Sequence, residues 1–147
     1  MEKKPDRVEM NICETQAMLY EAAARMGYDL KSFSEYFLNS EFCSRSMDTS
    51  YSRYQMADPG EIMDFLDMDS VRKTNICQSK GEAYWIGFMY RYLYYCLGKT
   101  SRQLMQEYPF RLMCRVYPGL HSLDEEMAAD ILTEGNTQKE SKTIRTE

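Results

Sequence analysis

The sequence contains one histidine, His121, and this residue is the first to consider for catalysis. Tyr117 lies four residues before it and Asp124 three residues after it, so a hydroxyl and a carboxylate are close in sequence. A catalytic histidine needs an acid that orients its ring and, often, a nucleophile. In YPGLHSLDEE, however, His121 lies between a helix breaker and a helix start, which favours a hydrogen bond that stabilises the turn.

Carboxylates and thiols also occur in patterns that could bind a metal. DFLDMD brings Asp64, Asp67 and Asp69 together but lacks the glycine and the distal glutamate of a calcium loop, so we interpret it as a solvated helix end. The five cysteines are widely spaced and never form CxxC, which predicts reduced, mostly structural thiols: Cys13, Cys43, Cys77, Cys96 and Cys114. The sequence also lacks a Gly-rich phosphate loop, a GxSxG elbow and an HExxH pair. We therefore predict no catalytic site, no cofactor and no metal.

The most distinctive stretch is YWIGFMYRYLYYCLG, residues 84–98, which is rich in aromatic residues and contains no acidic residue. As a helix it has one aliphatic face and one aromatic face with Arg91 at its edge. The run is too short to span a membrane and contains a charge near its centre, so no membrane contact is expected. A helix that is apolar nearly all round is normally a core helix, but a tyrosine-rich face also suits an interface.

Arg91 is the residue that separates these two readings. An unpaired buried charge is too costly to keep, so Arg91 must stack on tyrosine rings, meet a carboxylate or face solvent. If it faces solvent, the aromatic face becomes a docking surface with arginines at its rim. The candidate partner-binding residues on this hypothesis are Tyr84, Phe88, Arg91, Tyr92, Tyr95, Arg102, Arg111 and Arg115.

The charge is unevenly distributed along the 147 residues, whose formal net charge is -5. Residues 84–121 contain 5 basic groups and 1 acidic group, whereas the segments before and after them are acidic. An acidic protein repels nucleic acid, because phosphate binding depends on basic charge, and so nucleic acid is not the expected partner. The N-terminal MEKKPDRVEM lacks the apolar run of a secretory signal, which predicts a cytoplasmic protein.

Apolar residues recur at intervals of three and four along most of the chain, which predicts an all-α fold. The first helix is expected over about residues 8–26 and should end at Gly27, a residue suited to a left-handed C-cap. Capping patterns then predict helix starts at Ser32, Ser40 and Asp58. The stretch 48–55 and the stretch 68–81 have no clear period and are expected to be connections.

The aromatic stretch forms the expected central helix, about residues 84–97, which Gly98 ends. Further helix starts are predicted at Thr100, Pro109 and Ser122. Pro118 and Gly119 should break the helix that begins at Pro109 near Tyr117. The sequence thus predicts a single compact bundle of six or seven helices over residues 1–133 and a disordered tail over residues 134–147, which has one apolar residue in its length.

Three stretches, EAYWIGFMYRYLYY, TSRQLM and YPGLHSLDEEMAADI, resemble a family of small, uncharacterised bacterial helical proteins. In that family a YWIGY.YRYW helix precedes a short SSK turn and a Y.G.HT.D.E.AI ending. The similarity covers about residues 83–132 and, more loosely, GYDLKSFSEYFLNSEF. Two departures are clear: Leu93 stands where the family has a tryptophan, and Ser101 with Arg102 where a serine-lysine pair is common.

The resemblance implies a role in toxin–antitoxin gene clusters, where such proteins are encoded beside a small helical protein and an ADP-ribosyltransferase-like toxin. It implies a non-enzymatic protein that binds or neutralises a partner protein, with that toxin as the candidate partner, and gives no oligomeric state. Because antitoxins often repress their own operons, an alternative is a nucleic-acid-binding regulator that uses the basic segment 99–117. Residues in that segment would contact phosphates: Arg102, Arg111 and Arg115.

Overall fold

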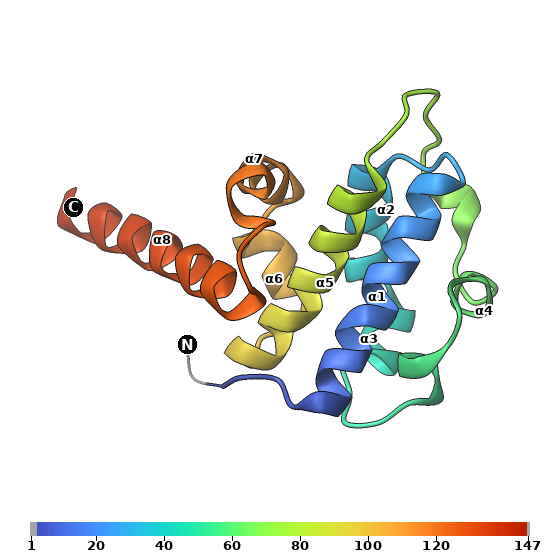
Figure 1. Cartoon of the computed structure of the whole chain (residues 1–147), viewed down its shortest axis with the longest axis horizontal. Coiled ribbons are helices and arrows are strands. Elements are labelled where there is room, and N and C mark those ends of the chain that lie inside the picture. Colours follow the sequence, from blue (N-terminus) through green and yellow to red (C-terminus); the bar gives the residue numbers. More distant parts are fainter. Residues whose placement is uncertain (1–2, 147) are drawn as a thin grey trace.

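The computed structural model describes residues 3–146, with side chains for residues 3–135 (Figure 1). This part of the chain is all-α, which confirms the predicted fold class. It contains eight α-helices: α1 (Arg7–Arg25), α2 (Leu30–Asn39), α3 (Glu41–Ser46), α4 (Pro59–Met63), α5 (Lys80–Leu97), α6 (Ser101–Glu107), α7 (Phe110–Leu120) and α8 (Glu125–Thr146). Two short 3-10 helices, Arg53–Met56 and Met68–Ser70, lie in the predicted connections. From residue 136 on, the expected disordered tail lies outside the residues that the structure describes in full.

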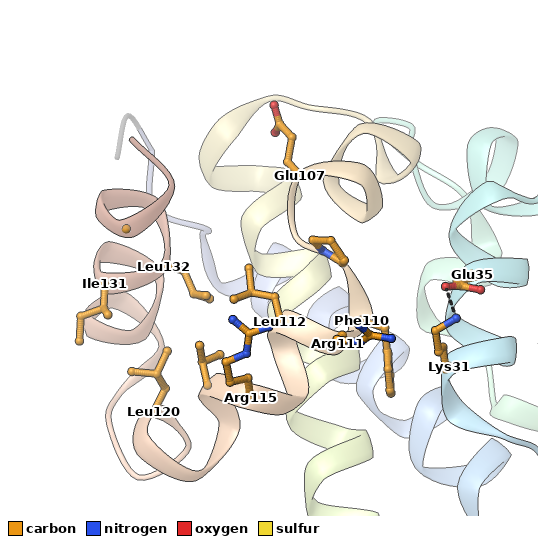
Figure 2. Close-up of a pocket in the computed structure, with 13 residues that line it drawn as sticks. Lys31, Glu35, Glu107, Phe110, Arg111, Leu112, Arg115, Leu120, Ile131 and Leu132 are labelled. Carbon is orange, nitrogen blue, oxygen red and sulfur yellow. Dashed lines mark ion pairs between the residues drawn. The ribbon is translucent and has the colours of Figure 1, made fainter. Parts of the chain in front are cut away.

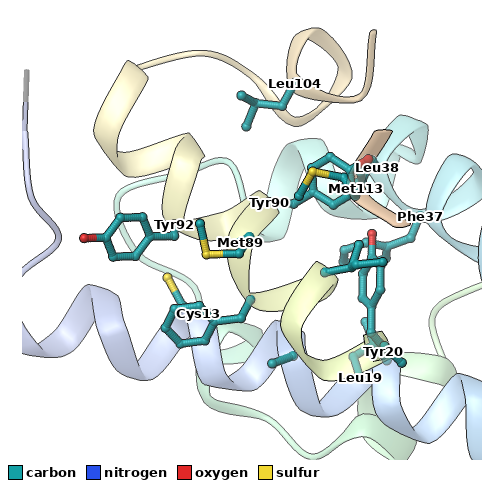
Figure 3. Packing of buried hydrophobic residues seen from close by; sticks show 14 of the residues in the cluster. Cys13, Leu19, Tyr20, Phe37, Leu38, Met89, Tyr90, Tyr92, Leu104 and Met113 are labelled. Atoms are coloured by element: carbon teal, nitrogen blue, oxygen red, sulfur yellow. The ribbon is translucent and has the colours of Figure 1, made fainter. Parts of the chain in front are cut away.

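The core forms around α1 and α5, which lie side by side (Figure 1). Their close approach depends on Gly87 of α5, because a Cβ at this position would lie 2.7 Å from the Cγ atom of Tyr20 on α1. Tyr20 is fully buried, and its ring meets Phe33 and Phe37 of α2 edge-on. Figure 3 shows Tyr20 and Phe37 within the core. Aromatic pairs at such angles are favourable beyond the area they bury. The predicted central position of α5 is therefore confirmed.

Two helices, α2 and α8, are capped by a different residue from the one predicted. Asp29, rather than Ser32, caps α2 by accepting a hydrogen bond from the Ser32 N–H. The Ser32 hydroxyl instead accepts a bond from the backbone N–H of Arg72. Likewise Asp124, rather than Ser122, accepts from the Met127 N–H in the first turn of α8. In each case an aspartate near the predicted start offers a charged acceptor at the helix N-terminus, where negative charge is stabilising.

The elements around α5 follow the prediction more closely. Gly98 ends α5 in the left-handed conformation, with φ of 65°. Thr100 and Gln103 form the expected capping box of α6. By contrast, α7 does not break at Tyr117 but continues through Pro118 to Leu120. Pro118 has no N–H to donate to the carbonyl four residues before it, so α7 loses one backbone hydrogen bond shortly before it ends at Leu120.

The long connection between α4 and α5 is attached to the turn between α1 and α2. Tyr28 and Lys73 form an isolated antiparallel bridge, which is the only β pairing in the described part of the chain. Gln78 accepts a hydrogen bond from the Leu30 N–H and donates one to the Tyr28 carbonyl. Among the described residues, none of the helices combines the length and the apolarity needed to cross a bilayer.

Candidate protein-binding site

Arg91 lies inside the bundle and is fully buried. Its Nη1 atom donates to the Asp48 carboxylate at 2.7 Å, and its Nε atom donates to the Gln16 side-chain oxygen at 2.8 Å. Nη2 donates to the Ser101 hydroxyl at 2.9 Å and contacts the Cys43 sulfur at 3.3 Å. The guanidinium also lies 4.6 Å from the centre of the Tyr94 ring. Arg91 is therefore both paired with a carboxylate and stacked on a tyrosine.

The partners of Arg91 bond to one another as well. Asp48 accepts from the backbone N–H of Ser101 at 2.8 Å and from its hydroxyl at 2.6 Å, while Gln16 donates to the Gly87 carbonyl at 2.9 Å. Burial alone lowers the pKa of Arg91, but the Cys43 sulfur and the Asp48 carboxylate outweigh it and hold the pKa above its usual value. We call these five residues the Arg91 network: Gln16, Cys43, Asp48, Arg91 and Ser101. It joins α1, α5, the end of α3 and the start of α6.

This burial corrects the expectation that Arg91 takes part directly in a docking surface. The aromatic face beside it is also largely internal. Tyr84, Phe88 and Tyr92 form a column of stacked rings along α5, with centroids 6.5 and 6.1 Å apart, and only Tyr84 is half-buried rather than buried. Phe88 and Tyr92, predicted as contact residues, are buried core residues of α5, which packs against α1 and α8. Tyr95 is half-buried.

The three arginines predicted to form the rim are all exposed, but they do not share one environment. Arg102 donates from Nε and Nη2 to the Asn39 carbonyl, at 3.1 and 2.9 Å, and so links α6 to the end of α2. Arg111 and Arg115 lie one helical turn apart on α7 and make no hydrogen bond or ion pair with any described residue. These two guanidinium groups are therefore available to another molecule.

Arg111 and Arg115 border a groove of about 660 Å³ between α7, α8 and α2 (Figure 2). Its apolar lining comes from Phe110, Leu112, Val116, Leu120, Ile131 and Leu132. The other charged groups at the groove are already paired: Lys31 with Glu35 at 3.1 Å, and Glu107 with Lys99 at 2.7 Å. We call this feature the α7–α8 groove. It combines an apolar floor with two unpaired positive charges.

The groove arises from the way α7 and α8 divide their apolar residues. Phe110 and Met113 of α7 turn into the core, while Leu112 and Val116 on the neighbouring face are only half-buried. After the turn at 121–124, α8 packs Leu132 inward and leaves Ile131 with 47% of its surface exposed. Each helix thus presents apolar side chains that the fold does not fully cover.

His121 has a local partner, and the acidic candidates in DFLDMD are exposed. The Nδ1 atom of His121 lies 2.8 Å from the Tyr117 carbonyl oxygen, and its ring stacks on the Tyr117 ring at 4.5 Å, in agreement with the predicted turn contact. Asp64, Asp67 and Asp69 are exposed. No group of three or more His, Cys, Asp or Glu side chains in the described part of the chain is arranged to hold a metal ion. All five cysteines are free thiols.

Sequence reasoning missed two parts of this arrangement. Asp48 lies 43 residues from Arg91, in a stretch without helical periodicity, so no pattern links the two. The apolar lining that Leu120, Ile131 and Leu132 contribute to the groove was not predicted, because periodicity within one helix does not tell which neighbouring helix leaves a gap. No family model, curated protein or solved structure matches this chain.

Proposed function

We propose that this chain is a non-enzymatic protein-binding component of a bacterial toxin–antitoxin or related conflict system. The α7–α8 groove is its contact site, and the partner is a toxin encoded nearby. The observation that carries the proposal is the pair of unpaired arginines, Arg111 and Arg115, beside an uncovered apolar floor. The conflict-system context comes from the sequence motifs around α5 and the 117–131 ending.

The groove favours one kind of occupant: an acidic amphipathic segment of the partner. An amphipathic helix can place apolar side chains against Leu112, Val116 and Ile131. Carboxylates on its flank can then meet Arg111 and Arg115, and the bidentate geometry of arginine and carboxylate makes such contacts specific. Arginine and large apolar residues at the centre of a contact typically dominate its binding energy. The rest of the chain is acidic and would repel an acidic segment, which directs that segment to this groove.

The same residues give less support to the alternative of a nucleic-acid-binding regulator. Of the three arginines in the segment 99–117, Arg102 is engaged with the Asn39 carbonyl. Arg111 and Arg115 lie beside an apolar floor, and a phosphate backbone, which is bound through basic charge, would leave that floor without a matching apolar surface. We therefore favour a protein partner in the cytoplasm.

The proposal is tested by co-expressing the chain with the adjacent ADP-ribosyltransferase-like toxin and measuring the affinity of the purified pair. Arg111→Glu with Arg115→Glu should weaken binding by at least about a hundredfold, because two attractive contacts become repulsive. The matched control is Arg7→Glu with Arg72→Glu, which makes the same charge change at exposed positions outside the groove. If both variants weaken binding equally, the loss of affinity is due to net charge alone, and the groove is not the contact site. Failure of the two wild-type proteins to associate would reject the proposed partner.

A further inference from the structure

A second and smaller cavity, of about 310 Å³, lies on another side of α7, where α5, α1 and the start of α8 meet. Its lining is unusual because most of it is aromatic. The rings belong to Tyr84, Trp85, Phe88, Tyr117 and His121. The cavity shares no lining residue with the α7–α8 groove. We call it the aromatic cavity.

The rings of the aromatic cavity come from α5 and from the end of α7. Within α5, Tyr84 stacks with Phe88 at 6.5 Å. The Tyr117 ring of α7 stacks with His121 at 4.5 Å and meets the ring of Trp85 on α5 edge-on at 5.7 Å. Phe88 is buried and Trp85, Tyr84 and Tyr117 are half-buried, so the rings have fixed neighbours and still reach the cavity.

Two carboxylates complete the lining, Glu14 from α1 and Glu125 from the first turn of α8. Both are exposed, and neither makes a side-chain hydrogen bond or an ion pair with a described residue. No lysine or arginine lines the cavity, and His121 is its one basic side chain. Aromatic faces carry partial negative charge and the two carboxylates add full charges, so this lining favours a cation over an anion.

We propose that the aromatic cavity binds a methylated ammonium group. Such a cation has an apolar surface that packs against rings and a charge that aromatic faces attract, and aromatic cages are a common solution for its recognition. An inorganic divalent cation would need several oxygen or nitrogen ligands, and the described part of the chain has no such cluster of three. A cavity of about 310 Å³ is large enough to admit a methylated ammonium group. This site is independent of the proposed protein partner, because it uses other residues.

The chain's only tryptophan, Trp85, lines the cavity, so its fluorescence reports binding directly. The probe is choline, and the control ligand is 3,3-dimethylbutan-1-ol, a neutral molecule of the same shape. Choline should shift or quench Trp85 emission in a saturable manner, and the neutral alcohol should bind at least about fivefold more weakly, as expected for loss of cation–π attraction. A peptide with Nε-trimethyl-lysine, compared with free choline, tells whether the head group belongs to a small molecule or to a side chain.

Variants then test the named residues. Glu14→Gln with Glu125→Gln should weaken choline binding about fivefold, because the cation loses two attractive charges but keeps the rings. Asp58→Asn with Asp64→Asn removes the same charge at exposed positions outside the cavity and should leave the affinity unchanged. All four positions are exposed, so folding is expected to persist.

Three results would overturn the proposal. The first is Trp85 emission that does not change when choline is added. The neutral alcohol could bind as well as choline, which would make the cavity merely apolar. Finally, the control pair Asp58 and Asp64 could weaken binding as much as Glu14 and Glu125 do, which would show that net charge alone attracts the cation.

Discussion

Arginine occupies two contrasting regions of this molecule. In the Arg91 network, each guanidinium nitrogen has a partner and the side chain has no exposed surface. At the α7–α8 groove, Arg111 and Arg115 have no partner among the described residues and lie beside uncovered apolar side chains. The same residue type therefore serves two purposes. Where its hydrogen bonds are satisfied internally it fixes how helices pack, and where they are free it can recognise another molecule.

The largest effect is expected when the Arg91 network loses its charge partner. Asp48→Asn keeps the shape but leaves Arg91 as a buried charge without a carboxylate, and this should lower the free energy of unfolding by about 3–5 kcal/mol. Urea denaturation followed by circular dichroism measures the change. If the free energy of unfolding falls by less than about 1 kcal/mol, solvent or another group must stabilise the charge of Arg91. Arg91 would then not differ from the groove arginines in its importance for stability.

The double variant Arg91→Met with Asp48→Leu sharpens the same comparison. A buried ion pair has a large desolvation cost, so replacing both members by apolar residues should cost less than Asp48→Asn alone. Comparing the double variant with the single variants Arg91→Met and Asp48→Leu gives the coupling energy between the two side chains. If the double variant is the least stable of the set, the hydrogen bonds to Ser101 and Gln16, rather than the charge pair, carry the stability of the network.

Much of the fold around this network could be predicted from sequence, because helices are local. The Gly98 C-cap and the Thr100 capping box depend on residues within one turn, and both predictions are confirmed. Arg91 could be restricted to three outcomes by the cost of an unpaired charge. The choice among them depended on Asp48, whose position near Arg91 is set by the packing of α3 against the rest of the bundle, and no local pattern contains that information.

A second prediction compares Gly87, at the contact between α5 and α1, with Gly119 on α7. Gly87→Ala should destabilise the protein by about 1–3 kcal/mol, because the new Cβ would lie 2.7 Å from Tyr20, which is fixed in the core. Gly119→Ala on α7 meets nothing within 4 Å and should stabilise its helix by up to about 1 kcal/mol. Thermal unfolding of both variants measures the difference. Effects of the same sign would contradict the view that only the α1–α5 contact is closely packed.

A third prediction concerns alkaline pH and the dryness of the core. Burial raises the pKa of Cys13, Tyr20 and Tyr90 above their usual values of 9.0 for the thiol and 10.0 for the phenols. Below pH 9 these groups keep their protons in both states. Above it the unfolded chain loses protons that the folded chain keeps, so the free energy of unfolding should fall by up to about 1.4 kcal/mol per pH unit for each group.

Urea denaturation at pH 7, 9, 10 and 10.5 measures this dependence. Burial also raises the pKa of Cys43, Cys96 and Cys114, so the control variant Cys13→Ala should make the fall between pH 9 and 10 shallower without abolishing it, and should leave the steeper fall above pH 10. A flat profile through pH 10.5 would show that these groups ionise in the folded state, and hence that water reaches the α1–α5 core.

The groove could be predicted only in part. Arg111 and Arg115 were identified as rim residues because they belong to the basic segment. The expected floor, however, was the aromatic face of α5, and most of that face is covered by α1 and α8. The actual floor comes from α7 and α8. The placement of α8 relative to α7 depends on the turn at residues 121–124. Helical periodicity gives the apolar face of each helix but not the gap between two of them.

The smallest effect on stability is expected at the groove, and this is what distinguishes its arginines from Arg91. Arg111→Ala with Arg115→Ala removes exposed side chains that bond to no described residue, so the free energy of unfolding should change by less than about 0.5 kcal/mol for each. Binding of the partner protein should nevertheless weaken by about tenfold or more, because each arginine would lose its contact with a carboxylate. A stability loss as large as that of Asp48→Asn would place these arginines among the structural residues. If neither binding nor stability changes, the two arginines do not contribute to recognition of the partner, and the apolar floor alone would have to account for it.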